Sequence, residues 1–164
     1  MPKSLITRAI RFGLAAALVS LVTSPAVAQA PKDIVEVAVA AGSFKTLVAA
    51  VQAAGLVDVL KRPGPLTVLA PTDEAFAKIP KADLDALMKD KAKLATVLQY
   101  HVLTGSVTAH DLTMMKDFGT AQGGRIQIAV SGTTLKINNA TIVKADVPAS
   151  NGIIHVIDTV LMPK

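Results

Sequence analysis

The run from Asn151 to Pro163 constrains the fold of this chain more than any other segment. An Asn-Gly turn signal opens it, and the β-branched stretch that follows is too short and too rich in Ile and Val to favour a helix. Both faces of this stretch are apolar, which predicts a strand covered on both sides. His155 and Asp158 interrupt it, and a buried strand retains such groups only where each finds a hydrogen-bond partner.

A second strand is predicted from Leu66 to Ala70, where Pro71 ends it, and Thr72 or Asp73 then caps a short helix. Further along, side chains that form one face of a longer helix recur at positions i, i+3, i+4 and i+7: Leu94, Val97, Leu98 and His101. This spacing places the imidazole of His101 on the buried face and Tyr100 to one side of it.

The remaining pattern divides the chain into a helical half and a strand half. Asp33 and Glu36 predict a capping box that opens a helix over 34–41, and Ser43 is the predicted N-cap of the next helix. After Gly105 the apolar period changes from helical to alternating, which predicts four strands joined by short turns as an antiparallel meander. Helices first and strands later indicate the α+β class, in a single domain without internal repeats.

Residues 1–28 have the layout of a cleaved secretory signal peptide. Lys3, Arg8 and Arg11 precede an apolar stretch that is too short to span a bilayer, and an Ala-Val-Ala sequence ends the segment. We therefore expect residues 29–164 to be one exported domain, secreted to the periplasm or beyond the cell, with no transmembrane anchor after cleavage. Because this layout is typical of a short bacterial export signal, we expect a bacterial source.

Removal of residues 1–28 also changes the charge of the protein. The chain has 17 Lys and Arg and 12 Asp and Glu, and three of the basic residues belong to this segment, which leaves a net charge of +2. A strongly basic face for nucleic acid is therefore not expected. With four Phe, one Tyr and no Trp, the chain has few aromatic rings on which bases could stack.

The sequence offers no recognisable catalytic or metal-binding motif. Three histidines without cysteine or close spacing do not make a zinc site, and no Gly-x-Ser-x-Gly elbow presents a nucleophile. His155 and Asp158 leave opposite faces of one strand, so structural hydrogen bonds are the predicted role of each. His101 is predicted to be a buried neutral imidazole. We expect no metal, no cofactor and no enzymatic activity.

Three blocks together resemble the fasciclin-1 (FAS1) domain family, in their order and in their separation. They are Thr67 to Phe76, the Tyr100-His101 pair, and Asn151 to Asp158 followed by Val160-Leu161. The resemblance covers the chain from about Ile34 to Pro163. It implies a FAS1-like β-wedge of mostly antiparallel strands with several packed α-helices.

The family resemblance also implies a function and a candidate surface. Members of this family are usually extracellular or attached to a cell surface, and they act in cell adhesion and matrix contact. Animal members contact integrins through a Tyr-His region and an Asp-Ile pair, which match Tyr100-His101 and Asp146-Val147 here. These four residues are the candidate interaction site, and the expected partner is a protein or another component of a cell surface or matrix.

Two other functions stay open at this point. Some algal relatives of the family bind carotenoids, so the chain is alternatively a carrier of an apolar small molecule held between the helices and the sheet. The high apolar content of the chain suits such a ligand, but a hydrophobic core needs the same residues. A stress-related envelope protein without a single partner is the third alternative.

Overall fold

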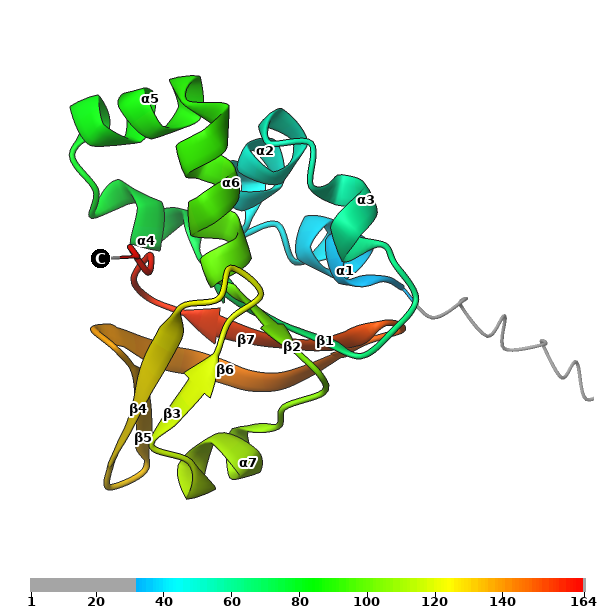
Figure 1. Ribbon diagram of the computed structural model, residues 1–164, viewed down its shortest axis with the longest axis vertical. Helices are drawn as coiled ribbons and strands as arrows, with labels where there is room; N and C mark the ends of the chain where they lie inside the picture. The colour runs from blue at the N-terminus through cyan, green and yellow to red at the C-terminus, as the bar shows by residue number, and fades with distance from the viewer. Residues whose placement is uncertain (1–31, 164) are drawn as a thin grey trace, which may run out of the picture.

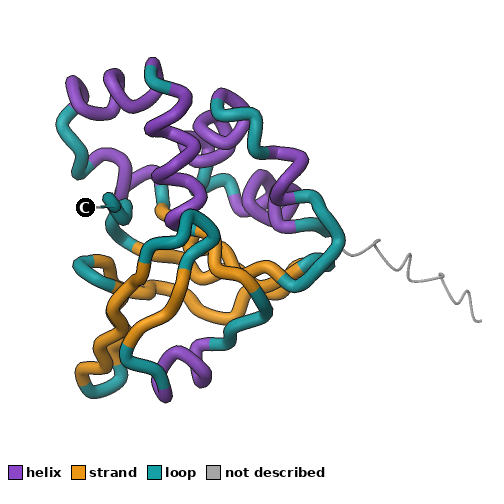
Figure 2. The backbone as a smooth tube through the Cα atoms, viewed as in Figure 1, coloured by secondary structure: helices purple, strands orange, loops and turns teal. Residues whose placement is uncertain are grey.

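A computed structural model describes residues 32–163, and the predicted signal peptide lies outside the described residues. In the described range, six helices gather on one side of a seven-stranded sheet, and a seventh lies on the other side beside the sheet (Figure 1). Figure 2 shows the same division, with the helical layer above the strands. The predicted α+β class and the β-wedge architecture are thus confirmed.

The helices lie mostly in the first two thirds of the chain, and the strands mostly in the last third. The helices are α1 Ile34–Ala41, α2 Lys45–Ala53, α3 Val57–Leu60, α4 Asp73–Ala77, α5 Lys81–Lys89, α6 Lys91–Tyr100 and α7 Ala109–Met114. The strands are β1 Leu66–Pro71, β2 Val102–Thr104, β3 Asp117–Gly119, β4 Arg125–Ser131, β5 Thr134–Ile137, β6 Ala140–Ala149 and β7 Gly152–Ile157.

The strand order in the sheet is β2-β1-β7-β6-β5-β4-β3. Strands β4 to β7 form the predicted antiparallel meander, whereas β1 and β7 pair in parallel. The two outer strands also approach each other, because Leu103 bridges to Thr120 and the Ala121 N–H donates to the Val102 carbonyl over 2.8 Å. The sheet therefore curls toward a barrel, which covers edges that would otherwise be open to pairing.

The parallel pair β1–β7 is buried on both faces, as the apolar run in β7 predicts. Val68 on β1 and Ile154 on β7 belong to the core between the sheet and the helices. Leu69 and Ile157 belong to a second core inside the curled sheet, together with residues of β4 and β5. Because strand side chains alternate between faces, this pair of strands contributes to both cores.

The Asn151-Gly152 turn joins three parts of the fold. The Asn151 side chain accepts the Ile34 N–H at the start of α1 over 3.1 Å and donates to the Leu60 carbonyl at the end of α3 over 2.5 Å. Gly152 pairs with Leu66 so closely that a Cβ on Gly152 would lie 1.8 Å from the Leu66 carbonyl oxygen. Only glycine fits this approach of two backbones.

Local capping follows the sequence in most places. The predicted capping box of Asp33 and Glu36 opens α1, and the Thr72 hydroxyl accepts the Ala75 N–H at the start of α4. A further capping box, of Thr108 and Asp111, opens α7. The alternating pattern predicted after Gly105 therefore begins only after α7, because this local cap favours a helical turn.

The predicted N-cap role of Ser43 is wrong. Helix α2 has no side-chain cap from its own flank; the Asp73 carboxylate instead accepts the Thr46 N–H over 2.8 Å and the Lys45 N–H over 3.3 Å. Burial acts to raise the pKa of Asp73, but these hydrogen bonds together lower it below its ordinary value. A carboxylate 27 residues away in sequence thus takes the place of the predicted local cap.

We expect Gly152→Ala to lower the free energy of unfolding by about 4 kcal/mol or more, because the added methyl overlaps the Leu66 backbone. Urea denaturation followed by circular dichroism measures the change. Gly119→Ala is the matched control, since a Cβ on Gly119 meets no atom within 4 Å, and we expect it to change stability by less than about 1 kcal/mol. A Gly152→Ala variant as stable as this control would contradict the close approach.

We expect Asp73→Ala to lower the free energy of unfolding by about 1–2 kcal/mol, because it removes the cap of α2. Ser43→Ala should change it by less than about 0.5 kcal/mol, because Ser43 contributes only its carbonyl, which accepts the Asp73 N–H over 2.9 Å. Equal losses from the two substitutions in the same denaturation experiment would show that the cap is local after all.

Candidate interaction surface and apolar pocket

Tyr100 lies in the interior at the end of α6, with 7% of its surface exposed. Its hydroxyl donates to the Arg125 carbonyl over 2.8 Å and accepts from the Asn138 side chain over 3.2 Å. A Cβ on Gly124 would lie 2.8 Å from the ring, so the backbone there packs directly on the tyrosine. Tyr100 therefore joins α6 to the turn before β4 and to the turn between β5 and β6.

His101 follows Tyr100 and is 2% exposed, on the inward face that the helical spacing predicts. Its Nδ1 lies 2.7 Å from the Val97 carbonyl, and its Nε2 lies 3.0 Å from the Leu161 amide nitrogen. Because a backbone amide can only donate, Nε2 accepts and Nδ1 carries the proton, as in a neutral imidazole. Burial lowers the pKa of His101 to about 4, although the bond to Val97 acts to raise it.

His155 is a second buried imidazole, fully enclosed on β7. Its Nδ1 accepts the Asp146 N–H over 3.2 Å, so Nε2 carries the proton and donates to the Val107 carbonyl over 2.8 Å. Asp158, just beyond the strand, accepts the Thr141 N–H over 2.8 Å. Both residues thus have the structural hydrogen bonds that the sequence predicts.

Asp146 and Val147 lie on β6, where the pairing with β7 is interrupted by a bulge. Asp146 has a φ of 53°, in the left-handed region that aspartate tolerates better than most residues, and it is exposed. One carboxylate oxygen accepts the Ala109 N–H at the first turn of α7 over 2.8 Å. The bulge therefore turns an acidic side chain outward and ties it to α7.

Two of the four predicted site residues, His101 and Asp146, are linked across the sheet, but the four do not share one face. The His101 carbonyl accepts the Leu69 N–H over 2.8 Å, Leu69 pairs with His155, and His155 accepts the Asp146 N–H. His101 forms the buried end of this chain of contacts and Asp146 its exposed end, whereas Tyr100 bonds to Arg125 and Asn138 instead. Sequence reasoning missed His155 as the residue that positions Asp146, because the two lie on different strands.

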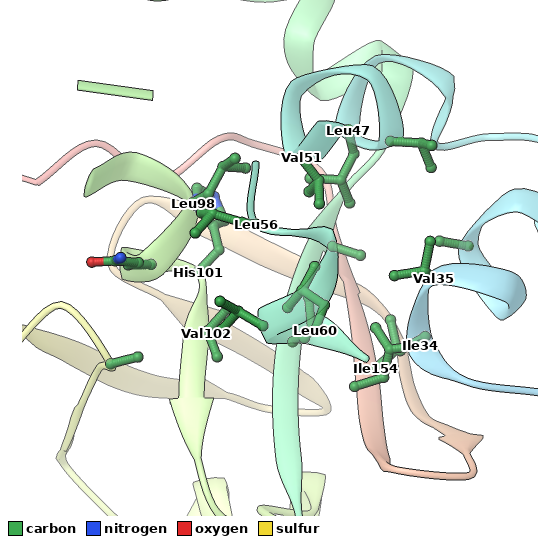
Figure 3. Close-up of a pocket in the computed structure, with 17 residues that line it drawn as sticks. Ile34, Val35, Leu47, Val51, Leu56, Leu60, Leu98, His101, Val102 and Ile154 are labelled. Atoms are coloured by element: carbon green, nitrogen blue, oxygen red, sulfur yellow. The ribbon is translucent and has the colours of Figure 1, made fainter. Parts of the chain in front are cut away.

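An apolar pocket opens between α1, α2, α3, α6 and the sheet (Figure 3). Figure 3 shows Leu56, Leu98, His101 and Val102 on one side of it, Ile34, Val35 and Ile154 on the opposite side, and Leu47 and Val51 above. The space inside is about 60 Å³. Gln99 and His101 are the polar residues among those that line the pocket.

Within residues 32–163, no three His, Asp or Glu side chains come together as metal ligands. None of the helices in this range is long and apolar enough to cross a bilayer. Two of the three histidines, His101 and His155, have both ring nitrogens engaged in hydrogen bonds of the fold. His101 and His155 therefore have a structural role in the fold, and the described residues contain no cluster of metal ligands.

Comparison with known proteins gives one consistent family. The family model for the fasciclin domain matches residues 42–163. An uncharacterized protein of Synechocystis is 46% identical over 130 residues, which are 79% of this chain and 97% of that protein. A second Synechocystis protein is 43% identical over 146 residues, which are 88% of this chain and 81% of that protein.

More distant relatives are longer than this chain. The pig transforming growth factor-beta-induced protein ig-h3 is 35% identical over 120 residues, which are 73% of this chain but 18% of that protein. Among solved structures, a FAS1 domain pair from the insect cell adhesion molecule fasciclin I aligns with a TM-score of 0.60 at 20% identity. The alignment covers 74% of this chain and 46% of that one, and it supports the fold.

We expect the stability of the protein to fall as the pH drops from 6.5 toward 4. His101 binds a proton near pH 6.5 when unfolded but near pH 4 when folded, so stability present above pH 6.5 is lost through this window, by about 3 kcal/mol. The pKa values of Asp73 and Asp158 are lowered below their ordinary 3.8, so the stability that these carboxylates contribute is lost mainly at lower pH, starting at about pH 5.

Urea denaturation at several pH values, for the wild type and for His101→Gln, measures this effect. The amide of Gln does not titrate, so the variant should be less stable at pH 7 but lose less stability on acidification. The other groups are common to both proteins and cancel in the difference. Parallel curves for the two proteins would show that His101 does not carry the pH dependence.

Proposed function

Because the chain belongs to the fasciclin domain family, we propose that it is an exported adhesion protein that binds a protein or another component of a cell surface or matrix. The export signal predicted in residues 1–28 supports a place in the periplasm or outside the cell. The Synechocystis relatives, which match over most of their length, support a bacterial source with a single fasciclin domain in residues 29–164.

The observation that carries the proposed function is the exposed Asp146 on the β6 bulge. One of its carboxylate oxygens is held by the Ala109 N–H, and the other has no hydrogen-bond partner among residues 32–163. A fixed carboxylate of this kind suits a cationic group on a partner. Val147 beside it is half-buried and adds apolar contact.

Tyr100 and His101 support the surface from inside. Their burial favours a positioning role, in which His101 holds the strand next to β7 and His155 holds the Asp146 amide. We propose no catalytic role, since neither His101 nor His155 has a free ring nitrogen to accept a proton.

A carrier of an apolar small molecule is the second candidate function. The specific observation that favours it is the pocket of Figure 3, whose lining presents hydrocarbon almost throughout. The carotenoid that the family resemblance suggests is one ligand of this class.

We expect Asp146→Asn to weaken adhesion several-fold while the protein stays folded, because asparagine keeps the Ala109 hydrogen bond and tolerates positive φ but lacks the charge. Beads coated with the protein are counted after washing on collagen, on fibronectin and on intact cells of the producing organism. Asp117→Asn is the control, since Asp117 is also exposed but lies on the outer strand β3, where it pairs with Arg125. If the wild-type beads are retained on a surface and the Asp146→Asn beads are retained as well as the Asp117→Asn beads, Asp146 does not belong to the interaction site.

A further inference from the structure

The apolar pocket has walls and dimensions that select among apolar ligands. We propose that it binds the methyl end of one straight acyl chain, as in a free fatty acid. The inference rests on the second candidate function, the apolar carrier, and names the ligand class of that same pocket.

The walls of the pocket leave no hydrogen bond for a polar ligand. Its surface is entirely apolar, and the His101 imidazole in its wall has both nitrogens engaged, by the Val97 carbonyl and the Leu161 amide. A polar group that entered would lose its water without gaining a partner. Only the hydrocarbon part of a ligand can therefore enter.

The size of the pocket selects a thin chain rather than a ring system. A single water molecule needs about 10–15 Å³ of such space, so the pocket of about 60 Å³ holds roughly four to six groups the size of a methylene. The end of a flexible alkyl chain fits these dimensions. A carotenoid, with its long rigid polyene and terminal rings, would require the helices to move away from the sheet.

The opening of the pocket can accommodate a polar head. Among the residues that line the pocket, Ala121 is exposed and Gln99, Leu56 and Val59 are half-buried, so these four lie toward solvent. Within residues 32–163 the Gln99 amide makes no side-chain hydrogen bond, so it can donate to a carboxyl or ester oxygen. No charged residue lines the pocket, so a fatty acid and its methyl ester should bind alike.

A series of straight-chain fatty acids tests the proposal. Isothermal titration of the purified protein with butanoate to dodecanoate, below the micelle concentration of each, gives the association constants. We expect the constant to rise about fourfold per added methylene, the factor that corresponds to about 0.8 kcal/mol, and to level off after about six carbons. The methyl esters should give the same series.

Two matched substitutions place the binding in the pocket. Ala121→Trp puts an indole at the opening and should weaken octanoate binding at least tenfold. Ala129→Trp puts the same group on an exposed position of β4 that does not line the pocket, and it should leave binding unchanged. Circular dichroism confirms that both variants are folded. Asp146→Asn should also bind octanoate normally, which separates this site from the adhesion surface.

Several results would overturn the proposal. Affinity that keeps rising through dodecanoate, or that Ala121→Trp leaves intact, would indicate adsorption to the surface. Binding to phosphatidylglycerol vesicles without binding of free fatty acids would assign the pocket to membrane lipid instead. Retention of β-carotene through gel filtration without fatty-acid binding would reject the acyl ligand but keep the carrier function. If neither class binds, both are rejected.

Discussion

The parallel pairing of β1 with β7 is the contact on which the rest of the structure depends. These are the first and the last strand along the chain, and their backbones approach so closely at Leu66 and Gly152 that any side chain on Gly152 would separate them. Because both faces of the pair are covered, it supplies both hydrophobic cores. The adjacent Asn151 side chain then attaches α1 and α3 to the same point. Loss of this pairing would therefore affect the helical layer and the curled sheet together.

Two buried imidazoles extend this organisation outward from the paired strands. His101 attaches the end of α6 to the C-terminal segment at Leu161, and His155 attaches β7 to the loop before α7 at Val107 and to the β6 bulge at Asp146. Each is held as a neutral tautomer by one donor and one acceptor from the backbone. Protonation of the His101 ring would set an N–H of Nε2 against the Leu161 amide N–H, which gives the fold a physical reason to prefer neutral pH.

The two candidate functions depend on two separate features of this fold, the β6 bulge and the apolar pocket. The bulge in β6 presents Asp146 on the outside, whereas the helices that pack over β1 and β7 leave a narrow apolar space beneath them. Adhesion depends on the exposed carboxylate of Asp146, whereas binding of an apolar ligand depends on the apolar surface inside the pocket. Substitutions at Asp146 and at Ala121 therefore address different faces of one domain and can be interpreted independently.

The sequence alone determined the interactions that span a few residues. The caps of α1 and α4, the inward face of His101, the four-stranded meander and the family motifs all follow from local spacing, because capping and amphipathic periodicity act within one or two turns. Only the tertiary structure decided the contacts between distant segments: Asp73 rather than Ser43 as the cap of α2, His155 beneath Asp146, the parallel direction of β1 and β7, and the pocket under the helices. These contacts depend on which distant segments folding brings within hydrogen-bond or van der Waals distance. The spacing of residues within one segment does not specify those partners.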